Sequence, residues 1–238
     1  MHLSSLTFIA ENISYQEING KRVLEVGSQD INGSVRCIFN LLNPCEYIGV
    51  DMEKGKGVDV VCPSEKLVEM FGENSFDIVV STEMLEHVLT WKTAVSNLKR
   101  VVKPNGCLLV TTRSHGFKYH GYPFDFWRYE LEDFQEIFAD TQIVKIEKDF
   151  EPPGVFLKAV KPENFAEKNL QYMHLYAIVL DRKVPSLDVE SREYRKKINR
   201  ILVREKRKKN HKLLKAKRKH LEKRIYEFLH LSKNYVQS

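Results

Sequence analysis

The densest group of side chains that could do chemistry lies in residues 112–129, which we call the aromatic segment. It combines two histidines, one aspartate, two arginines and a series of aromatic rings. An imidazole titrates near neutral pH, so His120 or His115 could act as a general base. Asp125 could orient the imidazole and stabilise its charged form. We therefore predict that this segment carries catalytic residues His120, His115 and Asp125.

The aromatic segment also contains groups suited to holding a substrate. Arg113 and Arg128 could bind an anionic acceptor such as a carboxylate or a sugar phosphate. Tyr122 and Trp127 could wall the site, and aromatic faces attract a cation. The alternative is structural, because an aromatic loop can also pack down as a lid.

A second group of candidate residues lies between residues 21 and 59. An apolar run ends at Glu25 and Gly27, and a second apolar run ends at Asp51. Ligands of doubly wound parallel sheets bind outside the carboxyl ends of the strands. Gly27 would let the backbone approach a ligand closely, and the Asp51 carboxylate could accept hydrogen bonds from both hydroxyls of a ribose. The layout predicts a nucleotide-binding site.

The loop after Gly27 distinguishes between two cofactors. A dinucleotide site needs the glycines of G-x-G-x-x-G, whereas Gln29 and Asn32 stand at the second and third glycine positions here. Asp30 adds a negative charge, which suits a cationic amino-acid tail better than a pyrophosphate. The loop favours S-adenosylmethionine over NAD.

Three further residues could contact the adenine. Met52 could lie against the ring as a polarizable apolar plate, although it could equally be an ordinary loop residue. Ser64 or Glu65 could accept a hydrogen bond from the adenine amino group. The same two residues also fit an ordinary helix start, with Ser64 as the cap and Glu65 in the first turn.

The elements that must position these residues alternate along the chain, which predicts a doubly wound, mostly parallel sheet covered on both faces. A short proline-glycine turn predicts that the last two strands form an antiparallel hairpin at the edge of the sheet. The seven predicted strands span residues 22–26, 46–51, 58–61, 76–81, 107–112, 142–149 and 153–160. The predicted helices span residues 33–42, 64–71, 91–102, 129–139 and 164–181.

Charge divides the chain into two parts. From Arg182 onward there are 20 Lys or Arg and 6 Asp or Glu, a net charge of +14, whereas the preceding residues have 18 and 26, a net of −8. We predict an N-terminal helix or lid over residues 1–19, with Leu3, Leu6, Phe8, Ile9 and Ile13 as its apolar face. An α/β domain follows over residues 20–182, and a basic helical tail over residues 183–238.

The tail has helical spacing of its apolar residues in two patches, separated by the basic stretch 204–212. This break argues against a continuous coiled coil. Three interpretations remain: an amphipathic helix on anionic lipid, an arm on nucleic-acid phosphates, or a solvated helix that docks on the domain or a partner protein. Aromatic residues are absent from the most basic stretch, which makes nucleic acid the weaker choice.

The remaining composition points to a reduced compartment. The four cysteines show no C-x-x-C spacing, and three of them fall in or beside predicted buried elements, so we predict small hydrophobes and no metal or disulfide site. Residues 1–12 lack the features of a signal peptide, and no apolar run reaches the length of a transmembrane helix. We expect a cytoplasmic protein, peripheral at the inner membrane surface if the tail binds lipid.

Taken together, these segments resemble the class I S-adenosylmethionine-dependent methyltransferases, over about residues 20–160. The resemblance rests on Glu25-Val26-Gly27, on Asp51, on residues 76–87 ending in Leu85-Glu86-His87, and on residues 98–110. The first loop departs from the family, in which it is usually richer in glycine.

The resemblance implies cofactor contacts from further residues. These are Thr82 and Glu83 near the sugar and the sulfonium, Glu25 and Ser28 beside Gly27, and His87, which could line the site or only orient its loop. The aromatic segment resembles a His-x-x-Pro-x-Asp-x-Trp-Arg stretch found in some of these enzymes, a few of which accompany glycan synthesis. A sugar-like acceptor is therefore one expectation.

The sequence thus predicts transfer of a methyl group from S-adenosylmethionine to a small molecule, such as a sugar or glycan intermediate. An alternative within enzymes is an RNA or ribosome methyltransferase that uses the tail for phosphate contacts. Against it, the chain shows no Asn-Pro-Pro-Tyr type stretch for a flipped base. The alternative outside enzymes is a binding or scaffold protein on the same fold.

Overall fold

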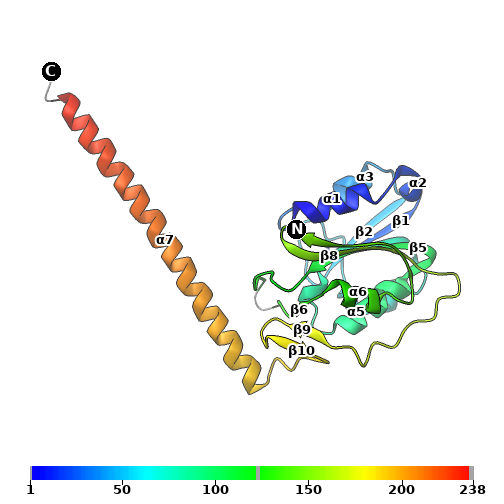
Figure 1. Cartoon of the computed structure of the whole chain (residues 1–238). Helices are drawn as coiled ribbons and strands as arrows, with labels where there is room; N and C mark the ends of the chain where they lie inside the picture. Colours follow the sequence, from blue (N-terminus) through cyan, green and yellow to red (C-terminus); the bar gives the residue numbers. More distant parts are fainter. Residues whose placement is uncertain (1, 122–123, 236–238) are drawn as a thin grey trace. The chain divides into compact units, whose positions relative to one another are not determined.

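The computed structural model describes residues 2–121 and 124–235, and side chains as far as residue 219. The chain divides into two compact units, residues 1–187 and 188–238 (Figure 1).

A seven-stranded sheet organises the first unit, in the order β3-β2-β1-β4-β5-β8-β7. Strands β1 to β5 pair in parallel, while β8 runs antiparallel to both β5 and β7. The predicted fold, mostly parallel with an antiparallel terminal hairpin, is confirmed. The strands are β1 (Arg22–Val26), β2 (Glu46–Asp51), β3 (Val60–Val61), β4 (Phe76–Thr82), β5 (Val102–Arg113), β7 (Gln142–Phe150) and β8 (Pro153–Val160).

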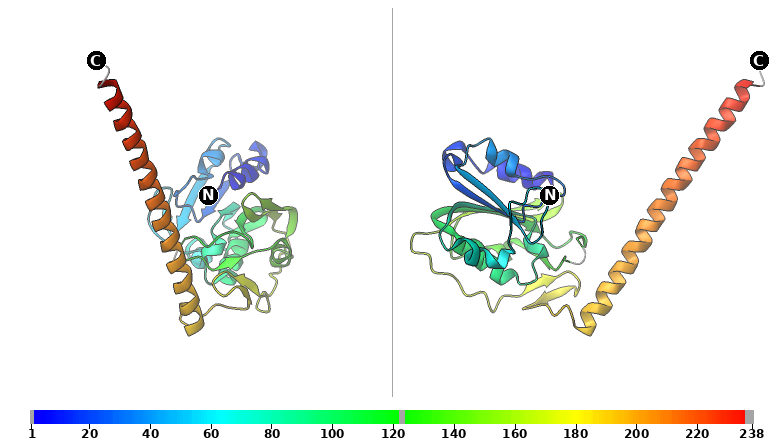
Figure 2. Two further views of the ribbon diagram at one scale, coloured as in Figure 1. Left: turned by 60° about the vertical axis from the view of Figure 1, so that its left-hand side comes forward. Right: turned by 180° about the vertical axis from the view of Figure 1, so that it is seen from behind.

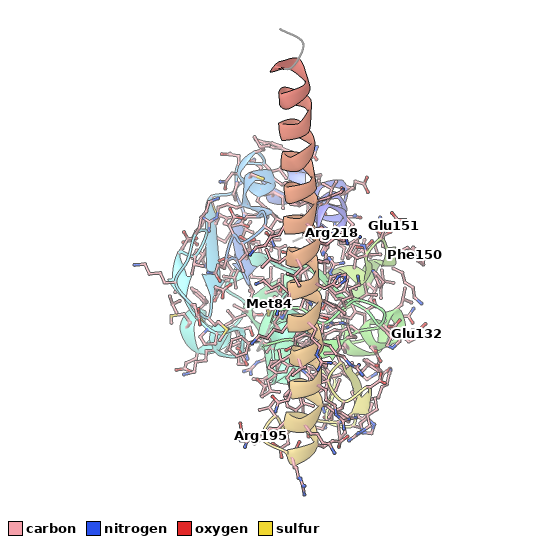
Figure 3. The ribbon with its side chains drawn as sticks, turned by 90° about the vertical axis from the view of Figure 1, so that its left-hand side faces the viewer. Met84, Glu132, Phe150, Glu151, Arg195 and Arg218 are labelled. Atoms are coloured by element: carbon pink, nitrogen blue, oxygen red, sulfur yellow. The ribbon has the colours of Figure 1, made fainter. Side chains whose placement is uncertain are left out.

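The central strands are apolar on both faces, which is why they occupy the middle of the sheet. Val23, Leu24 and Val26 of β1 are all buried, as are Val79 and Val80 of β4. Strands buried on both faces read as continuous apolar runs, because helices cover each side. The edge strand β7 consists of exposed and half-buried residues, and its end carries exposed Phe150 beside Glu151 (Figure 3).

Helices cover both faces of the sheet (Figure 1). On one face, Phe8, Ile9, Ile18 and Phe39 pack into one apolar cluster with sheet residues such as Val80. The helices of this face are α1 (Leu3–Glu11), α2 (Tyr15–Ile18) and α3 (Arg36–Asn40). On the other side of the sheet lie η1 (Ser64–Lys66), α4 (Leu67–Phe71), α5 (Trp91–Val101) and α6 (Leu131–Ile137).

The N-terminal residues form two helices instead of one. Of the predicted apolar face, Phe8 and Ile9 are buried and Leu6 and Ile13 pack partly against the same cluster, but Leu3 is 78% exposed. The α1 helix is therefore part of the sheet's helical layer, and its first turn reaches the carboxyl end of β4, where the backbone N–H of His2 donates to Glu83 (2.8 Å).

The predicted helix over residues 164–181 is wrong. This stretch contains turns and strand β9 (Leu175–Ala177), which pairs with β6 (Trp127–Arg128) and β10 (Arg182–Val184) in a separate antiparallel sheet (Figure 2). Leu175, Ala177 and Val179 are buried, and the residues between them are less so. That two-residue period is the pattern of a strand, and the edge of β6 supplies its partner.

The second unit consists mainly of one helix, α7 (Arg192–Tyr235), whose basic residues include Arg195 and Arg218 (Figure 3). The Ser191 hydroxyl caps it by accepting a hydrogen bond from the backbone N–H of Tyr194 (3.2 Å). Leu213 and Leu214 are more than half exposed. Within the part of the chain that the structure describes, no helix has the length and apolarity needed to cross a bilayer.

Candidate active site

The loop after β1 passes so close to the loop after β4 that Gly27 is required. Its φ is +82°, and a Cβ at this position would lie 2.7 Å from the Cβ of Met84. The backbone N–H groups of Gly27 and Ser28 both donate to the carbonyl of Val50 (2.9 and 3.0 Å). Because β1, β2 and β4 are parallel, their carboxyl ends bring these loops to one edge of the sheet.

Asp51 lies at this edge with its carboxylate facing the loop after β1. It accepts hydrogen bonds from the backbone N–H of Gln29 (3.1 Å) and of Met52 (2.7 Å), one on each oxygen. Each carboxylate oxygen can accept a further bond, so the group keeps the capacity to bind a pair of hydroxyls. The two sequence motifs predicted to form a nucleotide site are thus in direct contact.

The loops after β1 and β2 brace each other, and we call residues 27–36 and 51–59 the paired loops. The backbone N–H of Asp30 donates to the carbonyl of Lys56 (2.8 Å), and the two side chains form an ion pair (2.6 Å). Arg36 pairs with Asp59 (2.5 Å) and donates to the carbonyl of Gly57 (2.9 Å). Asp30 is therefore engaged in closing the loops, and its predicted contact with a cofactor stays a prediction.

Glu25 is a buried acid directly before the paired loops. Its side chain is 2% exposed and accepts hydrogen bonds from the Tyr47 hydroxyl (2.8 Å) and the Ser34 hydroxyl (3.5 Å). Burial raises the pKa of Glu25 to about 7, against the opposing effects of Tyr47, Arg36 and Ser34. A cationic group beside this carboxylate would stabilise its charged form.

Two buried hydroxyls stand where the strand order reverses between β1 and β4. Ser28 is 1% exposed and Ser81 is fully buried, and neither Oγ atom has a hydrogen-bond partner among the described residues. In open α/β sheets this reversal is where ligands bind. Their unmet hydrogen-bonding capacity suits a polar ligand.

The predicted adenine contacts lie further along the same edge. Met52 is 53% exposed, so its side chain is free to cover a ring. Ser64 is the first residue of η1, not its cap, and its hydroxyl donates to Glu65 (3.0 Å). The other oxygen of Glu65 accepts a bond from Thr90 (2.6 Å). Both residues keep acceptor capacity, and their predicted role stays a prediction.

Glu83 follows Thr82, the last residue of β4, and has a positive φ of 52°. It accepts hydrogen bonds from the backbone N–H of His2 and from the Ser5 hydroxyl (2.7 Å), and it forms an ion pair with Arg113. Burial would raise the pKa of Glu83, but these donors outweigh burial and lower it. Glu83 thus ties the first helix to the end of β4.

The prediction that Arg113 holds an anionic acceptor is corrected by this arrangement. Arg113 has no exposed surface, and its guanidinium contacts Glu83, Asp149 (3.2 Å), the Ser5 hydroxyl and the carbonyl of Pro152. Its charge is balanced inside the protein. Arg113 holds the ends of β4, β5 and β7 together and does not face an acceptor.

The prediction that Arg128 holds an anionic acceptor is corrected for the same reason. It is 1% exposed and forms a two-pronged ion pair with Asp125, at 2.6 and 2.9 Å. Its remaining donors reach the carbonyls of Phe117, Lys118 and Trp127. The pair fixes the fold of the aromatic segment from within.

Asp125 also contacts His120. It accepts from the His120 backbone N–H (2.6 Å) and lies 3.2 Å from the ring Nδ1. Burial would raise the pKa of Asp125, but the bonds from Arg128 and His120 outweigh burial and lower it. Asp125 is therefore an ionised partner for His120, whose side chain is 34% exposed.

Hydrogen bonds join the aromatic segment to the turn η2 (Leu85–His87), which follows β4, and to the residues just after it. The Trp127 indole donates to the carbonyl of Val88 (3.0 Å), and the Tyr129 hydroxyl donates to that of Leu85 (3.1 Å). Trp127 is 1% exposed, so its predicted substrate contact is corrected. Tyr122, also predicted to bind substrate, lies outside the described residues.

The two histidines predicted as alternative bases have different surroundings. His120 packs against His87 and Phe117. His115 is exposed, packs edge-on against Tyr176, and its backbone N–H donates to Glu130 (2.9 Å). His120 is thus the one held by Asp125 and adjoining η2, and it is the better candidate for contact with an acceptor.

Glu86 is a residue that sequence reasoning did not single out. Its side chain has no exposed surface; one oxygen accepts from Thr112 (2.7 Å), and the other has no hydrogen-bond partner among the described residues. That second oxygen lies 4.0 Å from Nε2 of His120. The available signal was its place between Leu85 and His87, directly after a strand that ends at the site edge.

Comparison with known proteins finds one family that matches part of the chain. Residues 24–110 match a family described as methyltransferase domain. No curated protein sequence matches the chain.

Solved structures share the fold at low sequence identity. A Burkholderia thailandensis 1,6-didemethyltoxoflavin-N1-methyltransferase with bound S-adenosylhomocysteine is 14% identical, with a TM-score of 0.52 over 67% of this chain and 79% of that one. A protein in complex with the Trm112 methyltransferase activator of Haloferax volcanii is 14% identical, with a TM-score of 0.56 over 70% and 92%.

A third neighbour, the [4+2]-cyclase SpnF, is 17% identical, with a TM-score of 0.51 over 66% of this chain and 80% of that one. Its name describes a different reaction, so the shared fold does not by itself fix the chemistry. The predicted resemblance is confirmed: the chain has the class I S-adenosylmethionine-dependent methyltransferase fold, and residues 24–110 match the methyltransferase domain.

Proposed function

We propose that this protein transfers a methyl group from S-adenosylmethionine to a small-molecule acceptor. The contact between Asp51 and the loop after Gly27 carries the proposal, because it joins a ribose-binding carboxylate to the turn where a cofactor backbone can approach. The methyltransferase domain match over residues 24–110 supports it.

The residues present fit the cofactor. Asp51 would accept from the ribose hydroxyls, and Met52 would cover the adenine. Glu25 would face the positively charged methionine end, and Ser28 and Ser81 would give their unpartnered hydroxyls to its polar groups. When bound, S-adenosylmethionine supplies a methyl group that its sulfonium has already activated.

The acceptor side of the reaction is assigned to the surroundings of His120. Holding the nucleophile in line and removing its proton are the tasks left to the protein. His120 is partly exposed and is oriented by ionised Asp125, so it is placed to act on an acceptor hydroxyl. Arg113 and Arg128 are buried and are not offered to an anionic acceptor, so we favour a neutral hydroxyl compound such as a sugar.

Calorimetric titration tests the cofactor. Saturable binding of S-adenosylmethionine and S-adenosylhomocysteine, with no binding of NADH, is the expected result. Asp51→Ala should weaken binding about 30-fold, because unpaired ribose hydroxyls cost about 2 kcal/mol. Glu53→Ala removes an exposed carboxylate from the same loop and should bind like the unaltered protein. Equal affinity of both variants would remove Asp51 from the site.

Turnover tests the acceptor side. Formation of S-adenosylhomocysteine is followed with saccharides and other hydroxyl compounds, and His120→Ala should slow it about 100-fold or more while cofactor affinity stays the same. His174→Ala, which removes an exposed histidine elsewhere, is the matched control. If the protein binds the cofactor but methylates no acceptor, the result favours a binding or scaffold role over catalysis.

A further inference from the structure

We propose that Glu86, His87 and His120 form a binding site for one divalent transition-metal ion. One ligand atom from each of the three side chains lies within 4.8 Å of the others. The cluster sits where β4 and β5 end, since η2 follows β4 and Glu86 is bonded to Thr112 of β5. This arrangement was not predicted from the sequence.

His120 is oriented as metal-binding histidines are. Its Nδ1 lies 3.2 Å from the carboxylate of Asp125, which leaves Nε2 directed at Glu86, 4.0 Å away. A histidine that ligates a metal usually donates its other ring N–H to a carboxylate or a backbone carbonyl, which fixes the tautomer. Asp125 fills that outer position for His120.

His87 is oriented in the same way, with a backbone carbonyl in place of the carboxylate. Its Nδ1 contacts the carbonyl oxygen of Phe124, and because a carbonyl only accepts, this nitrogen must carry the hydrogen. The other ring nitrogen is left for a ligand, and the His87 and His120 rings are 4.7 Å apart. Gly121 lets the loop lie against His87, because a Cβ there would be 2.8 Å from its Cε1.

Glu86 supplies the observation that points to a cation. It is fully buried and held by two hydrogen bonds, from Thr112 to one carboxylate oxygen and from the Phe126 N–H to its backbone carbonyl (2.9 Å). The remaining oxygen has no hydrogen-bond partner among residues 2–121 and 124–219. A buried carboxylate oxygen without a partner is costly, and a bound cation would satisfy it.

The donor set indicates which cation would bind. The 4.0 Å between Glu86 and His120 is too long for a hydrogen bond, but a metal ion between ligands at about 2.0–2.2 Å needs only a small contraction of the cluster. Two imidazoles and one carboxylate suit Mn²⁺, Zn²⁺ or another first-row ion better than Mg²⁺ or Ca²⁺.

With three protein ligands, the ion would keep coordination positions open for an oxygen atom of a bound acceptor. His120, one-third exposed, marks the side from which that oxygen would enter. A coordinated hydroxyl has a lowered pKa, so with the ion bound the ion would prepare the acceptor hydroxyl, and His120 would act as its ligand in place of the general-base role. This role rests on the proposed methyl transfer, whereas the binding site itself does not.

Metal binding is measured on the untagged full-length protein after treatment with a chelator, by equilibrium dialysis with Mn²⁺ and with Zn²⁺. We expect one equivalent to bind and Co²⁺ to show the visible absorption of a protein-bound ion. Glu86→Gln and His120→Gln should each weaken binding at least 10-fold. His174→Gln changes an exposed histidine elsewhere and should bind like the unaltered protein.

The outcomes separate the two proposals. Absence of saturable binding, or unchanged binding in both the Glu86 and His120 variants, would overturn the metal site. Because Glu86 is buried, thermal unfolding is recorded for each variant, and His120→Gln alone decides the matter if Glu86→Gln does not fold. S-adenosylmethionine binding is titrated on the same metal-free protein, so that loss of one property is distinguished from loss of the other.

Discussion

The paired loops and the aromatic segment lie at the same edge of the sheet but are held in different ways. The paired loops rely on backbone hydrogen bonds and partly exposed ion pairs, such as Lys56 with Asp30 and Arg36 with Asp59. The aromatic segment is held by charges with almost no exposed surface, above all Arg128 with Asp125.

The two regions differ in which charges remain available to a ligand. In the paired loops, Asp51 takes only backbone donors and retains capacity for a ligand. In the aromatic segment, both arginines form internal ion pairs. The groups that remain available to bind a ligand or move a proton are His120 and the neighbouring Glu86. A high density of ionisable groups therefore includes both structural residues and residues that could bind a ligand. Fully buried, paired groups such as the two arginines belong to the structural kind.

Breaking the internal pair should have the largest effect. Arg128→Met leaves Asp125 buried without its guanidinium, which should lower the free energy of unfolding by about 3–5 kcal/mol. Urea denaturation measures this. The double variant Asp125→Leu with Arg128→Met should recover much of the loss, because it removes both charges. A loss below about 1 kcal/mol in the single variant would contradict the role of the pair.

The buried acid beneath the paired loops should give the next largest effect, and it depends on pH. The pKa of Glu25 is about 7 in the folded protein against an ordinary 4.5, so the folded state binds the proton more tightly. Stability is therefore lost as pH rises from about 4.5 through 7, by up to about 3 kcal/mol.

Glu25→Gln mimics the protonated acid and should remove this loss. Urea denaturation should find the variant and the unaltered protein equally stable near pH 4.5, and the variant about 3 kcal/mol more stable at pH 8. Exposed Glu69→Gln is the control and should show no such trend. A difference that does not grow with pH would show that the pKa of Glu25 is the same in the folded and unfolded states.

The partly exposed pair of the paired loops should give the smallest effect. Arg36→Met breaks the ion pair with Asp59, whose side chain is 43% exposed, and should cost no more than about 1 kcal/mol in the same assay. It is the matched counterpart of Arg128→Met. If the two substitutions cost the same, the contrast between the two regions fails.

Much of the fold is readable from local patterns. The bounds of β1, β2 and β8 follow from short apolar runs between turn residues, and the contact of Gly27 and Asp51 follows from parallel strands that end at one edge. These features depend on neighbours in the sequence or on the rules of sheet topology.

The corrected residues depend on distant partners. Arg113 reads as a ligand-binding arginine until Glu83 and Asp149, 30 and 36 positions away, are found to enclose it. The stretch at 164–181 reads as helical until β6 offers an edge to Leu175 and Ala177. Glu86 could be noticed from its place after β4, but its unpartnered oxygen could not, because that depends on the hydrogen bonds from Thr112 and Phe126.

The ties of the first helix have a consequence for the order in which the chain is made. Ser5 bonds to Glu83, 78 positions later, and Ser4 bonds to Asp149, 145 positions later (2.6 Å). At a synthesis rate of about 5–20 residues per second, roughly 7 to 30 s pass between the appearance of Ser4 and that of Asp149. The α1 helix can therefore pack early against neighbours such as Ile18 and Phe39, but its polar ties to the sheet are completed only after β7 has been made.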